Sequence, residues 1–134
     1  MPGCILRVQG STTKVQKFLR ATELEPTKVY WKGEVGFPSS RGPSKFSGFN
    51  LSLSGSHGES LQKQARQALT FLQKNNEAML LLKSLGFTSV IIDFGLYDLA
   101  TENKPWPTYH LPAKLVVLLG KFNFELCLSF YGKP

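Results

Sequence analysis

The chain has 134 residues, a formal net charge of +7, 42% hydrophobic residues and 19% charged residues. This length suits one domain with its own core, so we expect residues 1–134 to form a single domain. The composition is too rich in aromatic residues for a disordered protein, and no stretch approaches the roughly 20 apolar residues that a membrane span needs. The first residues do not resemble a secretory signal, so we expect a cytoplasmic protein.

Positive charge is concentrated in the first part of the chain. Residues 1–50 contain eight Lys or Arg and three Glu, whereas residues 51–134 contain eight Lys or Arg and six acidic residues. A basic region attracts acidic partners, either protein or nucleic acid, over a long range. A solvated surface that aids solubility explains the same composition equally well, so both interpretations stay open here.

The predicted elements begin with a strand over residues 4–9, where apolar and polar residues alternate. A helix follows, with Val15 and Phe18 on its apolar face. Residues 28–32 and 49–54 alternate as the first strand does. The order of these two strands predicts a hairpin-like pair.

The second half of the chain begins with a helix whose predicted start is a capping box at residues 56–59. A shorter helix follows and should end at Gly86, a typical C-terminal glycine. A strand over residues 90–97, a helix over 112–120 and a strand over 122–131 complete the order. In this last strand every second residue is apolar, which predicts a covered face made of Phe122, Phe124, Leu126, Leu128 and Phe130.

These elements give the order β-α-β-β-α-α-β-α-β. Such an order favours an α+β or α/β fold in which a mixed five-stranded sheet carries its helices on one face. Each predicted strand has a polar side, so the second face of the sheet should be open to water. We therefore predict a two-layer sandwich.

The sequence offers no catalytic motif, no metal site and no sign of a cofactor. Two separate cysteines, Cys4 and Cys127, and two separate histidines do not supply the clustered ligands of a zinc site. Asp93 lies within an apolar strand, and a structural, hydrogen-bonded aspartate is the favoured interpretation over a site acid.

The polar face of the sheet is the better candidate for a binding surface. Tyr and Arg commonly anchor protein interfaces, and the predicted alternation gathers basic and aromatic residues on this face. These candidate partner-binding residues are Arg7, Lys28, Tyr30, Lys32, Tyr97 and Tyr131. Two long loops, 35–48 and 98–111, add the candidates Arg41, Lys45, Trp106, Tyr109 and His110.

Two stretches resemble a known family. Residues 23–34, which read Glu-Leu-Glu-Pro-Thr-Lys-Val-Tyr-Trp-Lys-Gly-Glu, and the closing helix and strand over 111–131 are similar to blocks of the bacterial domain of unknown function 4279 family. The resemblance implies a small α/β protein without an established enzymatic activity. It also implies a likeness to immunity proteins encoded beside bacterial toxins.

The sequence favours a non-enzymatic cytoplasmic binding protein whose partner is a protein with an acidic surface. In its most concrete form this is an immunity-type protein that occludes a bacterial toxin. The first alternative is a ligand-binding or enzymatic domain that uses the 98–111 loop and Asp93. The second is an RNA-associated protein that uses the basic N-terminal half, although nucleic acid is the less favoured partner because no RNA-recognition signature is present.

Overall fold

The computed structural model describes residues 3–36, 41–55, 60–96 and 108–131. Within these residues the elements follow the predicted order. They are β1 (Cys4–Gly10), α1 (Thr12–Ala21), β2 (Lys28–Tyr30), β3 (Ser47–Ser52), α2 (Leu61–Lys74), α3 (Asn76–Leu85), β4 (Ser89–Leu96), α4 (Ala113–Phe122) and β5 (Glu125–Phe130).

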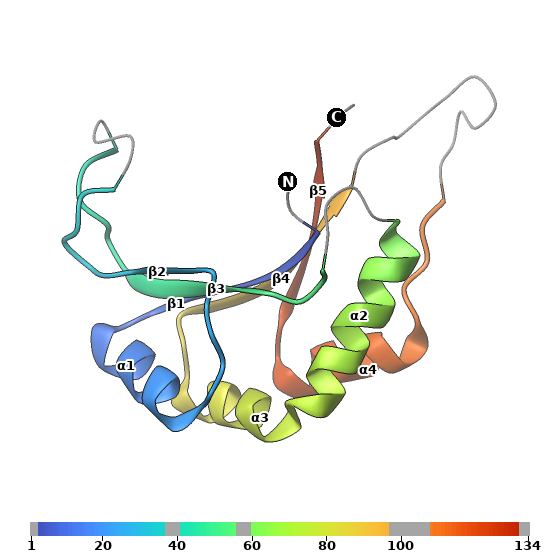
Figure 1. Ribbon diagram of the computed structural model, residues 1–134, viewed down its shortest axis with the longest axis horizontal. Helices are drawn as coiled ribbons and strands as arrows, with labels where there is room; N and C mark the ends of the chain where they lie inside the picture. The colour runs from blue at the N-terminus through green and yellow to red at the C-terminus, as the bar shows by residue number, and fades with distance from the viewer. Residues whose placement is uncertain (1–2, 37–40, 56–59, 97–107, 132–134) are drawn as a thin grey trace.

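The strands form one sheet in the order β2-β3-β1-β4-β5. All neighbouring strands are antiparallel except β4 and β5, which are parallel and joined through α4. The four helices lie together beneath one face of the sheet (Figure 1). This arrangement confirms the predicted mixed sheet with helices on one face, and β2 and β3 form the predicted hairpin.

Local signals in the sequence set the ends of the helices. The Ser11 side chain accepts a hydrogen bond from the backbone N–H of Lys14 at the start of α1. Gly86 ends α3 in the left-handed conformation, with φ of 67°. The connections at these two caps, from β1 to α1 and from α3 to β4, are therefore short.

Two helix boundaries differ from the prediction. The helix α2 is capped by Ser60, whose hydroxyl accepts from the N–H of Lys63, and the predicted capping box at 56–59 lies outside the described residues. The helix α4 continues beyond residue 120 to Phe122 and ends at the left-handed Asn123. The extra residues bury the Phe122 side chain in the core, and this burial favours the longer helix.

The core lies between the sheet and the helices. Alternate residues of β1 and β4 point into it, and Phe18 of α1 stacks on Phe49 of β3 with ring centroids 5.2 Å apart. A parallel ring pair of this kind adds to the area that both residues bury. The outer strands β2 and β5 contribute less, because each has a neighbouring strand on one side only.

The predicted covered face of the last strand is wrong for three of its five residues. Phe122 and Phe124 are buried, but both precede β5. Leu126, Leu128 and Phe130 are exposed by 47%, 37% and 52%. They lie in register with buried residues of β4 and so face the helical side, but β5 is the outermost strand and their packing is one-sided.

The difference in burial between β4 and β5 can be tested with two register partners, Ile92 and Leu126. Ile92→Ala should lower the free energy of unfolding by about 2–4 kcal/mol, because it leaves a cavity in the core. Leu126→Ala should cost about 1 kcal/mol or less, because that side chain is already half-exposed. Urea unfolding followed by circular dichroism measures both, and equal losses would show that the helical layer also covers β5.

Candidate protein-binding surface

The open face of the sheet presents its side chains in rows that cross the strands. One row runs through all five strands and consists of Lys28, Asn50, Arg7, Ile91 and Glu125. The next row consists of Ser52, Ile5, Asp93 and Cys127. The face is therefore mostly polar and includes two isoleucines, Ile5 and Ile91, as expected for a surface in water.

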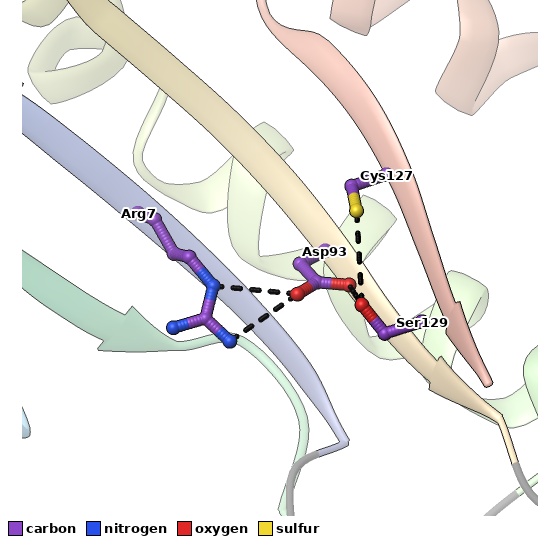
Figure 2. Close-up of polar contacts among 4 residues, drawn as sticks. All are labelled: Arg7, Asp93, Cys127 and Ser129. Carbon is purple, nitrogen blue, oxygen red and sulfur yellow. Dashed lines mark hydrogen bonds and ion pairs between the residues drawn. The ribbon is translucent and has the colours of Figure 1, made fainter. Parts of the chain in front are cut away.

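A polar network joins three strands on this face (Figure 2). Arg7 of β1 donates from Nε and Nη2 to Oδ2 of Asp93 in β4, at 3.3 and 3.2 Å. Ser129 of β5 donates its hydroxyl proton to Oδ1 of Asp93 at 2.7 Å. The Sγ of Cys127 lies 3.7 Å from the hydroxyl of Ser129.

The network satisfies and neutralises the Asp93 carboxylate. Both oxygens accept hydrogen bonds, and the guanidinium of Arg7 balances the negative charge of a side chain that is only 9% exposed. The geometry assigns Asp93 a structural role that ties β1, β4 and β5 together.

A second feature is the extension of the β2–β3 hairpin beyond the sheet. The backbone N–H of Gly33 donates to the carbonyl of Ser44 at 2.9 Å, and that of Ser44 donates to Glu34 at 2.7 Å. A further bridge joins Val35 and Pro43. We call the described residues 28–36 and 41–52 the basic hairpin, whose part beyond β2 and β3 projects past the sheet on the side away from the helices (Figure 1).

The basic hairpin brings together most of the positive candidates found in the sequence. Its exposed cations are Lys28, Lys32, Arg41 and Lys45, and Glu34 is the acidic residue within its described part. The apolar side chains of Val35 and Phe46 are also exposed there. The basic hairpin therefore combines four exposed cations with two exposed apolar side chains.

Tyr30 links the basic hairpin to the open face of the sheet. Its phenol lies against the position that a side chain of Gly48 would occupy, in contact with the backbone of β3. The ring is half-buried as a result. A side chain at position 48 would meet both the backbone carbonyl of Val8 and the Tyr30 phenol, so close approach rather than a turn requires Gly48.

The other candidates lie at the opposite edge of the sheet. Tyr109 packs against Phe130 with ring centroids 6.5 Å apart, and His110 and Tyr131 are exposed nearby in the chain. Four strand spacings, about 19 Å, separate β2 from β5, so these residues and the basic hairpin are two distinct regions. Tyr97 and Trp106 lie outside the described residues.

The sequence interpretation missed a basic groove along α2. A hollow of about 560 Å³ has an apolar floor that includes Leu53 and Phe71 and a rim of polar side chains. The rim residues are Lys63, Arg66, Gln67, Thr70 and Lys74. Their spacing of three or four residues on a helix is visible in the sequence and could have indicated this face.

The described residues contain no group of three or more His, Cys, Asp or Glu side chains placed to hold a metal ion. Burial and the nearby Asp93 carboxylate raise the pKa of the Cys4 thiol far above its ordinary value, so this thiol stays protonated. None of the described helices combines the length and hydrophobicity of a membrane span.

Comparison with known proteins gives one finding about the family. The model of the family described as "Domain of unknown function (DUF4279)" matches residues 2–133, nearly the whole chain. Neither the search of curated proteins nor the search of solved structures returned a match. The family match confirms the resemblance found in the sequence and brings no activity with it.

The polar network predicts unequal losses when its members are removed. Asp93→Ala should lower the free energy of unfolding by about 1–3 kcal/mol, because it leaves the Arg7 guanidinium and the Ser129 hydroxyl without their acceptor beside a mostly buried site. Ser129→Ala should cost about 1 kcal/mol, since it removes one neutral donor. Thermal unfolding of both variants measures the difference, and an unchanged Asp93→Ala protein would contradict the structural role.

The two thiols should react at very different rates. Cys4 is fully buried and its raised pKa keeps it protonated, whereas Cys127 is partly exposed. A disulfide reagent applied to the native protein at mildly alkaline pH should modify Cys127 alone, and Cys4 only after denaturation. Mass spectrometry of the labelled peptides would reveal early labelling of Cys4, which would contradict its burial.

Proposed function

The chain belongs to the domain of unknown function 4279 family, and we propose that it is a non-enzymatic protein that binds an acidic surface of a protein partner. The basic hairpin is the observation that carries this proposal. It projects from the sheet and presents four exposed cations, Lys28, Lys32, Arg41 and Lys45.

The chemistry of the basic hairpin suits a protein interface. Protein interfaces combine an apolar centre with a polar rim, and Val35 and Phe46 supply exposed apolar side chains among the cations. Complementary charge mainly accelerates the encounter of the two partners. Arg7 contributes less than its charge suggests, because its guanidinium is already paired with Asp93.

The most specific form of the proposal is an immunity-type protein of the cytoplasm that occludes a bacterial toxin. Its support is the likeness to immunity proteins that the family resemblance implies, together with the basic hairpin. Occlusion needs a protruding, charged element rather than a reactive group.

The test is charge reversal on the basic hairpin. The variant Lys28→Glu, Lys32→Glu, Lys45→Glu should lose the partner in affinity capture from a lysate of the source cells, because its cations are exposed and free of ion pairs among the described residues. Binding of the wild type should also weaken as salt rises, since exposed charges are screened over about 8–10 Å. Circular dichroism should show both proteins folded.

A matched variant separates local from overall charge. Lys17→Glu, Arg20→Glu, Lys114→Glu changes the net charge equally at exposed sites on α1 and α4, and it should keep the partner. Equal loss in both variants, or retention in the hairpin variant, would contradict the proposal. Loss of the captured partner on nuclease treatment would instead indicate RNA.

A further inference from the structure

The two outer strands of the sheet differ in how their free edges are protected. The strand β2 has three residues, follows Pro26 and contains Lys28, which are features that prevent pairing at an edge. The strand β5 has six residues and no Lys, Arg or Pro. Among the described residues no further strand pairs with β5. Within the part of the chain that the structure describes, the edge of β5 is thus long and carries none of these protective features.

The backbone groups on this edge can be identified from the ladder. The N–H of Tyr131 donates to the carbonyl of Leu96 in β4. Alternate residues of a strand direct their N–H and C=O to the same side, so the backbone groups of Tyr131 and of every second residue before it point toward β4. The backbone groups that point away from β4 are those of Leu126, Leu128 and Phe130. These are also the three residues whose apolar side chains are exposed.

We propose that β5 pairs in antiparallel orientation with β5 of a second copy of this chain, with Leu128 opposite Leu128 on the two-fold axis. In this register Leu126 of one copy lies opposite Phe130 of the other. Each residue whose N–H and C=O point away from β4 then faces another such residue, so the two strands can form backbone hydrogen bonds. The pairing joins the exposed apolar side chains of both copies on the helical side of a continuous sheet.

Charge argues for a second copy as the occupant of this edge. The strand β5 carries one charged residue, Glu125 at its start, so it has nothing to attract a strongly charged partner. The exposed cations of the basic hairpin lie about 19 Å away across the sheet, beyond the screening length of about 8 Å, so they add little repulsion between copies at this edge. A two-fold interface requires a self-complementary patch. The strand β5 provides one, because its exposed apolar residues Leu126 and Phe130 lie two positions to either side of Leu128.

The test is the mass in solution, measured by light scattering over about 1–200 µM, a range suited to a small interface. The wild type should approach about 30 kDa, twice the chain mass of 14.9 kDa, as concentration rises. Leu128→Lys should remain a monomer, because it places a charge on the two-fold axis. Val29→Lys is the matched control, since Val29 has the same 37% exposure and lies on the other outer strand, and it should still dimerise.

Cross-linking of the wild type gives a second measurement that needs no change to β5. In the proposed register the two Cys127 side chains are diagonal neighbours about 7–8 Å apart, within reach of a short bismaleimide, while Cys4 is buried. Cross-linked dimers should form in the wild type and be absent in Cys127→Ser. A wild type that stays a monomer, a dimer that survives Leu128→Lys, or a dimer that does not cross-link would each overturn the proposal.

Discussion

Helices cover only one face of the sheet, and most other features follow from this constraint. It places alternate residues of β1 and β4 in the core and leaves the residues between them in β1 half-buried on the other face. Asp93 is tolerated in a mostly apolar strand because its position falls on the uncovered face, where Arg7 and Ser129 can reach it. The same constraint leaves the edge of β5 with one-sided packing.

The surface divides into regions of different character as a result. The basic hairpin extends the sheet at the β2 edge and concentrates exposed cations there, whereas the β5 edge is apolar and almost uncharged. A partner attracted by charge and a partner matched by apolar area would therefore bind at opposite ends of the sheet. Occupation of one edge leaves the other accessible, so the two proposed interactions do not compete.

Much of the fold could be predicted from the sequence because local patterns and packing agree over most of the chain. Period-2 alternation identified the strands, and Gly86 marked a helix end. The exposure of Leu126 could not be predicted, because a residue pattern reports which side chains share a face and not whether a helix lies over them. Strand order decides that, and it depends on pairing between distant segments.

The grouping of the candidate surface could be predicted only in part. Lys28, Lys32 and Lys45 fall within the predicted hairpin-like pair, and the backbone ladder beyond β2 shows how far that pairing extends. Arg7 was expected to be an available cation, and its pairing with Asp93 depends on the register of β1 and β4. Residues in different strands meet through that register, which the sequence does not encode locally.

The contact between Tyr30 and Gly48 has a spectroscopic consequence. The aromatic ring lies against the backbone of Gly48, so its ring current should displace the resonance of a Gly48 α proton from the usual glycine range. Tyr30 of β2 and Gly48 of β3 are register partners within the basic hairpin, and β3 also pairs with the central strand β1. This proton would therefore sense a change in the pairing of β2 with β3, and the protein contains its own NMR reporter for structural change at the base of the hairpin.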